Sequence, residues 1–348
     1  MKGIVAIVLV IGLLGFGTSR GADWWNTNVN TPISSTDKAV PFQIEPGETP
    51  TQIGTDLYTA GLIRSTIAFD MYTRVNNAGP KFQAGSFVLN TNMSLAQIVS
   101  ALQHGKSDQK TITFKEGLPL REQAKVAETK GIGTAAEYLA AAKDPAWAST
   151  YTFLPAKAGN PDAPYEGYLF PDTYLIDPKA GVRGLIKAQL DQFGVVFSAD
   201  LRAQIAKDTP ARPAQTIQSI VILASMVDRE ANAITASDRG NVCSVYYNRL
   251  KVKMTLGVDA TLLYALKRLQ PEPTAAELGL NSPYNTRLYG GLPPGPISNP
   301  GKAAILACIN PPQTQYLYYF TDRVGVTHFE TNGADFERDK DKYGLSGS

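Results

Sequence analysis

The pattern of apolar and polar positions over residues 40–106 predicts a small unit that mixes helices and strands. Apolar and polar residues alternate over 40–44, which is typical of a half-buried strand. Apolar residues at helical spacing follow Ser94, which can cap the helix that they predict. The expected order is strand, helix, helix, strand and helix, over 40–44, 51–60, 67–75, 85–89 and 94–104.

Residues 107–342 mix helices and strands without regular alternation, which predicts an α+β fold. Strands are expected over 111–114, 316–321 and 328–331, and helices over 120–129, 134–142, 182–193, 215–231, 237–250, 259–266 and 303–309. The helix over 215–231 is apolar on most sides and should be buried. The segment 290–301 holds four prolines and four glycines, so it can be neither helix nor inner strand.

Ahead of both units, residues 3–19 form a run of 17 uncharged and mostly apolar residues. As a helix this run would span roughly 25 Å, slightly less than the ~30 Å hydrocarbon core of a membrane. It is either a cleaved signal peptide or a membrane anchor. Arg20 disrupts the cleavage site, and Trp24 and Trp25 suit a membrane interface, so the anchor is favoured. We therefore expect a transmembrane anchor at 1–22, a polar linker at 23–39, and a single-pass protein of the cell membrane whose larger, C-terminal part is extracytoplasmic.

Composition narrows the chemistry that this chain can perform. Its 348 residues carry 33 Lys and Arg against 31 Asp and Glu, and a net charge of +2 argues against nucleic-acid binding. Two histidines and two cysteines leave little for metal binding, so we expect no metal and no cofactor. Cys243 and Cys308 lie in apolar helical patterns and are predicted to be inert thiols of the core. Carboxylates, hydroxyls and amides remain for catalysis.

The strongest chemical feature is the acidic end of the buried helix over 215–231. Asp228 and Glu230 point about 200° apart on a helix, so one should face a cleft and the other a structural partner such as an arginine. Glu230 lies near the angular position of Leu223, Met226 and Val227, and apolar neighbours raise the pKa of a carboxyl and suit it to donate a proton. The alternative is a charged helix end that meets solvent.

Two further segments have both a functional and a structural interpretation. The aromatic-rich segment 166–174 could be a sugar-binding wall or an aromatic part of the core. The segment 290–301 could form the rim of a groove or a rigid connector. Just before it, Tyr284, Asn285 and Thr286 offer an amide and hydroxyls that could hydrogen-bond a polar substrate.

Seven segments, in this order, together resemble the MltG (YceG-like) family of endolytic murein transglycosylases. They are 115–117 (KEG), 166–174 (EGYLFPDTY), 224–230 (ASMVDRE), 246–250 (YYNRL), 259–261 (DAT), 282–286 (SPYNT) and 291–301 (GLPPGPISNPG). The resemblance implies an N-terminal anchor, a LysM-like unit at 40–106 and a catalytic domain at 107–342.

The resemblance also implies the catalytic group and the reaction. The residue that serves as both acid and base in the family corresponds to Glu230 in this sequence. It would protonate the bond between N-acetylmuramic acid and N-acetylglucosamine, and then accept the proton of the muramoyl C6 hydroxyl as a 1,6-anhydro ring closes. Such a reaction needs no water and no cofactor. The predicted substrate contacts are Glu166, Asp172, Tyr284, Asn285, Thr286 and Asn299, although Glu166 and Asp172 could instead stabilise the fold.

The expected partners are peptidoglycan strands, the membrane and possible peptidoglycan synthases. The LysM-like unit is expected to hold glycan strands, or else to be a rigid spacer. A rival hypothesis is a non-catalytic, membrane-anchored peptidoglycan-binding scaffold for cell-wall synthases, in which Glu230 performs no chemistry. A pyridoxal-phosphate lyase is a further alternative, but no phosphate-binding glycine loop lies beside Lys187 or Lys302.

Overall fold

A computed structural model describes residues 21–104, 110–155, 159–230 and 238–345. The chain divides into two compact units, Met1–Thr111 and Ile112–Ser348. The boundary predicted between residues 106 and 107 lies outside the described residues, as does most of the predicted anchor at 1–22. In the described part of the chain, no helix is both long enough and apolar enough to cross a membrane.

The smaller unit has the element order that the sequence predicts. Strand β1 (Ala39–Ile44) pairs antiparallel with β2 (Gly85–Asn90), and Phe42 lies opposite Phe87. The helices are α2 (Pro50–Thr59), α3 (Thr66–Val75) and α4 (Leu95–His104), with a 3₁₀ turn, η2, at Gly79–Lys81. Thr49 and Gln52 form a capping box at the start of α2. The apolar faces of these elements enclose a core of their own.

Part of the segment predicted to be a linker packs on the smaller unit. Residues Asn26–Asn30 form a π-helix, η1, in which Val29 is 1% exposed. The ring of Trp25 lies 6.2 Å from that of Tyr72 on α3. The sequence does not predict these two contacts, because Trp25 and Val29 lie in a mostly polar segment and form no apolar pattern.

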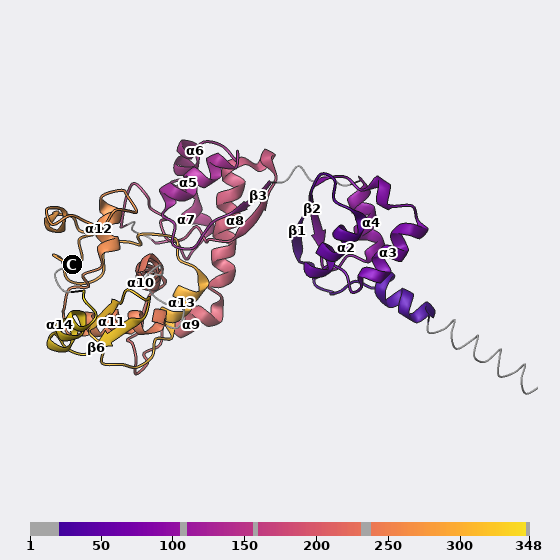
Figure 1. Cartoon of the computed structure of the whole chain (residues 1–348). Helices are drawn as coiled ribbons and strands as arrows, with labels where there is room; N and C mark the ends of the chain where they lie inside the picture. The colour runs from indigo at the N-terminus through magenta and orange to yellow at the C-terminus, as the bar shows by residue number, and fades with distance from the viewer. Residues whose placement is uncertain (1–20, 105–109, 156–158, 231–237, 346–348) are drawn as a thin grey trace, which may run out of the picture. The chain divides into compact units, whose positions relative to one another are not determined.

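The larger unit surrounds helix α10 (Ile217–Glu230), in which every residue from Ile220 to Asp228 is buried. Figure 1 shows α10 in the middle of this unit, near α11 (Asp238–Lys251), α12 (Asp259–Ala265) and α13 (Lys302–Ile309). The other helices are α5 (Leu120–Thr129), α6 (Ala135–Ala141), α7 (Ala146–Thr150), α8 (Gly181–Val196), α9 (Ala199–Ile205) and α14 (Gly333–Lys342), with 3₁₀ turns η3 (Pro178–Ala180) and η4 (Glu277–Gly279).

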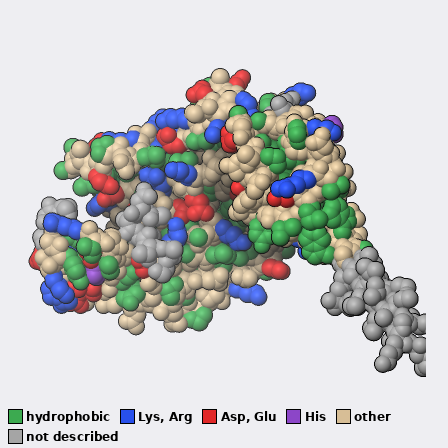
Figure 2. Space-filling view, turned by 45° about the vertical axis from the view of Figure 1, so that its right-hand side comes forward, with side chains coloured by type: hydrophobic (Ala, Val, Ile, Leu, Met, Phe, Trp, Pro, Cys, Tyr) green, Lys and Arg blue, Asp and Glu red, His purple; other side chains and the backbone are tan. Residues whose placement is uncertain are grey.

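Two small sheets complete the larger unit. Strand β3 (Lys110–Thr113) pairs with β4 (Thr173–Ile176), and β5 (Tyr318–Thr321) pairs antiparallel with β6 (Thr327–Glu330). The sequence does not predict α7, α9, α14 or β4. Helix α14 buries none of its residues, so it has no apolar stripe to reveal it. Lys and Arg side chains are interspersed with Asp and Glu over the face shown in Figure 2.

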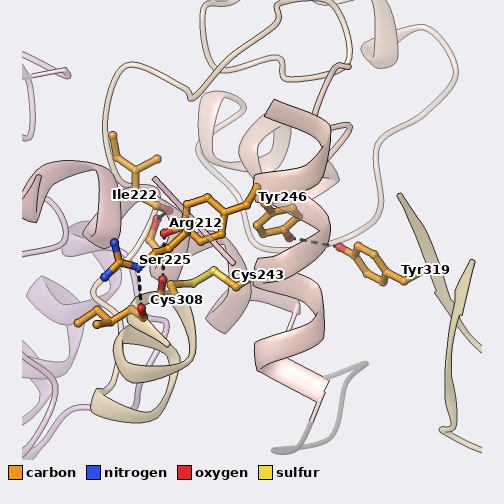
Figure 3. The surroundings of a disulfide bond; sticks show 9 residues. Arg212, Ile222, Ser225, Cys243, Tyr246, Cys308 and Tyr319 are labelled. Carbon is orange, nitrogen blue, oxygen red and sulfur yellow. Dashed lines mark hydrogen bonds between the residues drawn. A yellow bond between two sulfur atoms is a disulfide. The ribbon is translucent and has the colours of Figure 1, made fainter. Parts of the chain in front are cut away.

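The prediction of two separate thiols is wrong. Cys243 on α11 and Cys308 on α13 form a disulfide, with their Cα atoms 5.3 Å apart (Figure 3). The two cysteines are 65 residues apart in sequence, and only the packing of α11 against α13 brings them together. The apolar surroundings of both residues were predicted correctly, because both are fully buried.

Candidate active site

The two acidic residues at the end of α10 have the opposed roles that their spacing predicts. Asp228 faces inward, where its Oδ2 accepts a hydrogen bond of 2.6 Å from the backbone N–H of Gly301. Its Oδ1 lies 3.8 Å from the Nε of Arg239, the structural arginine of this pair. Asp228 therefore joins the end of α10 to the start of α13. Glu230, at the last helical position, faces a pocket instead.

The pocket beside Glu230 has a volume of about 790 Å³, within the range of pockets that hold small molecules. Its walls come from α10, α11, α12, β5 and α14, and from the loops that join them. The lining residues are Arg229, Glu230, Arg249, Leu256, Gly257, Val258, Asp259, Ala260, Leu263, Leu269, Gln270, Glu272, Arg287, Tyr318, Tyr319, Phe320, Thr321, Phe336 and Lys340.

The surroundings of Glu230 favour its protonated form. Burial raises the pKa of Glu230 to about 7, and the nearby carboxylates of Asp259 and Glu272 act in the same direction. The hydroxyl of Tyr319 donates a long hydrogen bond of 3.4 Å to Oε2 of Glu230 and opposes this shift. A carboxyl with a pKa near 7 is suited to donate and then accept a proton at neutral pH. This environment is unlike that of a charged helix end in open solvent.

Tyr319 is itself held by a second tyrosine. Its hydroxyl lies 3.2 Å from that of Tyr246 on α11, and Figure 3 shows the two rings reaching toward each other. Tyr246 is fully buried, so it ties β5 to the core of the unit. The hydroxyl that contacts Glu230 is therefore fixed from behind by the fold.

Basic side chains line the same pocket and are also fixed in place. Arg249 donates hydrogen bonds of 2.6 Å to the backbone carbonyls of Leu256 and Leu317. Arg287 makes a two-point ion pair with Asp259, at 2.5 and 2.9 Å. The pocket thus presents cations and hydrogen-bond donors around a protonatable carboxyl, which suits a polar substrate that carries negative charge.

The structure places the six predicted substrate contacts away from this pocket. Among the described residues that line it, none of the six is present. The amide of Asn285 donates to the carbonyls of Leu278 and Leu280, both at 2.9 Å. Thr286 Oγ1 accepts from the N–H of Val258 at 3.0 Å. Because Val258 lines the pocket, Thr286 supports the pocket wall from behind, whereas Asn285 fixes the backbone of Leu278 and Leu280.

Glu166 and Asn299 meet in a buried junction. Oε1 of Glu166 accepts hydrogen bonds from the N–H of Leu120 at 2.8 Å and from the amide of Asn299 at 3.1 Å. Oδ1 of Asn299 accepts from the N–H groups of Gly167 and Leu169. These bonds join the segment 291–301 to the segment 166–174. Of the two interpretations of 290–301, a rigid connector is the one that this network fits.

The remaining predicted contacts lie in other places. Asp172 is exposed, accepts a hydrogen bond of 2.8 Å from Gln192 and lines a surface groove with Glu116 and Lys302. Tyr284 is buried and lines a further pocket of the larger unit. The aromatic residues of 165–174 belong to the core rather than to an open wall; they are Tyr165, Tyr168, Phe170 and Tyr174. Direct contact of the six residues with a substrate stays a prediction.

The chain matches the model of one protein family over most of its length. The model of the YceG-like family matches residues 42–342, which is most of the chain. The chain belongs to the YceG-like family. This confirms the resemblance found in the sequence.

Two similar proteins and one solved structure agree with the YceG-like assignment. An endolytic murein transglycosylase of Bacillus subtilis is 30% identical over 93% of this chain and 90% of its own length. One of Streptococcus pneumoniae is 27% identical over 96% of this chain and 64% of its own length. The 2.6 Å crystal structure of a YceG-like protein from Listeria monocytogenes covers 88% of this chain and all of its own, with 26% identity and a TM-score of 0.57.

Several residues around Glu230 in this YceG-like chain escape prediction from sequence. Tyr319 and Glu272 line the pocket but come from segments far apart in the chain. Tyr319 belongs to a short aromatic strand whose pattern indicates only burial. Arg249 and Asp259 could have been found, because their segments are among the seven that carry the resemblance. In the described part of the chain, no group of three or more His, Cys, Asp and Glu residues could hold a metal ion.

Proposed function

We propose that this protein is a lytic transglycosylase that cuts peptidoglycan strands between N-acetylmuramic acid and N-acetylglucosamine, with Glu230 as its acid and base. The observation that carries this proposal is a carboxyl with a pKa of about 7 in a pocket of substrate size. The names of the Bacillus subtilis and Streptococcus pneumoniae relatives support the substrate and the class of reaction.

One carboxyl is sufficient for this reaction. A hydrolytic glycosidase needs a second carboxylate, either to activate water or to attack the sugar. Here the protonated Glu230 gives its proton to the glycosidic oxygen, and the bond from this oxygen to C1 of the muramoyl sugar breaks. The C6 hydroxyl of the same sugar then bonds to C1, and the Glu230 carboxylate takes its proton. The product is a 1,6-anhydro end, and Glu230 returns to its protonated form.

We also propose that this activity takes place at the outer face of the cell membrane and terminates the growth of new strands, near peptidoglycan synthases. The Cys243–Cys308 disulfide supports an extracytoplasmic location, because disulfides persist in oxidising compartments. The uncharged run at residues 3–19 would serve as the anchor.

The reaction is tested with purified protein and un-crosslinked strands in ¹⁸O-labelled water. We expect mass spectrometry to show shortened strands with 1,6-anhydro ends that contain no ¹⁸O, since an internal hydroxyl closes the ring. Labelled reducing ends would show a hydrolase. Intact strands would favour the non-catalytic scaffold.

The smaller unit is proposed to hold glycan strands. It has a pocket of about 590 Å³ lined mostly by polar residues between the end of β1 and α2, including Gln43, Gln52 and Asp56. Polar groups of this kind suit the hydroxyl and acetamido groups of a sugar. Because the unit has its own core, it can be purified alone and mixed with insoluble peptidoglycan. Retention is expected, and its absence would indicate a spacer.

A further inference from the structure

A second pocket of the larger unit lies next to that of Glu230 and has no role in the proposed chemistry. Its volume is about 470 Å³, and it is lined by residues of α5, α6 and α12 and of the segments 160–166 and 282–284. The rings of Tyr264 and Tyr284 stand in its wall with their centroids 5.0 Å apart. The size is that of pockets that hold small molecules.

One residue in the wall of this pocket carries a polar group that the fold leaves without a partner. Tyr284 is 7% exposed, and its buried hydroxyl has no hydrogen-bond partner in the described part of the chain. The neighbouring Tyr264 hydroxyl, by contrast, accepts a hydrogen bond of 2.9 Å from Asn160. An unpaired buried hydroxyl is costly and uncommon in proteins, so a bound group that pairs with it would be stabilised.

The charges around the pocket favour an anion. Three basic residues, Arg121, Lys143 and Lys267, line it. The exposed acid Asp162 lies 3.9 Å from Lys143, and Glu122, outside the lining, lies 3.5 Å from Arg121, so the lining residues carry more positive than negative charge. Glu166 also lines it, and burial raises the pKa of this carboxyl to about 7, which lowers its negative charge at neutral pH. The hydroxyl and amide groups of the wall suit peptide groups, and the basic residues suit a carboxylate.

The wall between the two pockets is thin. Arg121 of the second pocket donates to the carbonyl of Arg268, and Arg229 of the Glu230 pocket donates to the next carbonyl, that of Leu269. Burial lowers the pKa of Arg229, and the nearby positive charge of Arg121 lowers it further. Lys267 lines the second pocket while Leu269 lines that of Glu230. Helix α12 and the residues just after it thus have the Glu230 pocket on one side and the second pocket on the other.

We propose that this second pocket binds the carboxylate-bearing peptide that branches from the muramoyl sugar of the substrate, with Tyr284 and the basic residues as its contacts. The inference rests on the proposed function, because it takes the substrate class from it. Strands that carry peptides are then better substrates than strands without them.

The test uses N-acetylmuramyl-L-alanyl-D-isoglutamine, a single sugar with a short acidic peptide and no glycosidic bond to cut. Its binding to the purified protein is measured by calorimetry for wild type, Tyr284→Phe and Tyr168→Phe. Tyr168 is the matched control, because its buried hydroxyl also has no partner in the described residues but lines neither pocket. We expect Tyr284→Phe to weaken binding roughly 3- to 10-fold and Tyr168→Phe to bind as wild type does.

Removal of an unpaired hydroxyl should leave the thermal midpoint unchanged or higher. Weaker binding by Tyr284→Phe would then not be due to unfolding. Equal binding by Tyr284→Phe and wild type, or no binding by wild type, would overturn the inference. A third outcome separates the two proposals: the wild-type protein binds the probe in a way that depends on Tyr284, but it cuts no strands. This outcome would support the peptide site and overturn the proposed function.

Discussion

The region around Glu230 and the buried junction of Asp228, Glu166 and Asn299 differ in how they hold a carboxyl. In both, burial raises carboxyl pKa values to about 7. In the junction, Asp228 and Glu166 accept short hydrogen bonds from the backbone N–H groups of Gly301 and Leu120, at 2.6 and 2.8 Å. Glu230 instead accepts a long bond of 3.4 Å from a tyrosine and faces a pocket.

The comparison shows that a raised pKa by itself marks burial rather than catalysis. A proton donor also needs access to its substrate and freedom from strong bonds to the backbone. Glu230 meets both conditions, whereas Asp228 acts as a fixed connection between α10 and α13. The junction should thus govern stability, and Glu230 should govern rate.

Asn299→Ala is expected to have the largest effect on stability. It removes the oxygen that accepts from the N–H groups of Gly167 and Leu169, so both buried N–H groups are left unpaired. It also removes the hydrogen bond that the Asn299 amide donates to Glu166. We expect the free energy of unfolding, measured in urea, to fall by roughly 3–5 kcal/mol. The exposed Asn76→Ala, which loses one bond to Tyr72, is the control and should cost less than about 1 kcal/mol. An Asn299→Ala protein of normal stability that fails to cut strands would make Asn299 a substrate contact.

Loss of the disulfide should also affect stability rather than chemistry. Cys243→Ala with Cys308→Ala opens a loop of 65 residues, for which chain entropy predicts a loss of about 4 kcal/mol. The measurement is urea unfolding without reductant, and wild type with reductant should approach the variant. The kcat of the folded double variant should match that of wild type, because neither cysteine lines the Glu230 pocket. A large fall in kcat with stability unchanged would contradict the separation of the two regions.

The smallest expected effect is on the pH profile. Glu230 must start protonated, so kcat/KM of wild type should fall above about pH 7, tenfold per pH unit. The Tyr319 hydroxyl bonds the charged form and lowers this pKa, so Tyr319→Phe should move the fall to higher pH, by up to about one unit.

Tyr246→Phe is the matched control for Tyr319→Phe, because its hydroxyl contacts Tyr319 rather than Glu230. It should shift the profile less. A Tyr319→Phe profile that coincides with that of wild type, or that moves to lower pH, would show that this hydroxyl does not tune Glu230.

The elements with a clear apolar period were predictable from sequence, and so was the orientation of Asp228 and Glu230. The period of 3.6 residues places these two side chains on opposite sides of α10 whatever surrounds the helix. Elements without an apolar stripe were not predictable, as α14 shows, because it packs on β5 through the ring of Phe336 rather than by a buried face.

Residues that act together from distant segments were also beyond prediction. Asn285 and Thr286 were expected to contact substrate because an amide and a hydroxyl suit a polar substrate, and this contact stays a prediction. Their bonds to buried backbone, and those of Asn299, could not be predicted, because the same groups suit either partner. The disulfide was missed for a similar reason, since a sequence separation of 65 says nothing about the packing of α11 on α13.

The central claim is that Glu230 is the acid and base of a strand-cutting reaction. Its most direct test is the initial rate at which Glu230→Gln releases 1,6-anhydro ends from un-crosslinked strands, measured by mass spectrometry beside wild type. Glutamine keeps the shape of the side chain but has no acidic proton, so we expect a loss of roughly 10²- to 10⁴-fold with an unchanged thermal midpoint. Release at the wild-type rate would contradict the account.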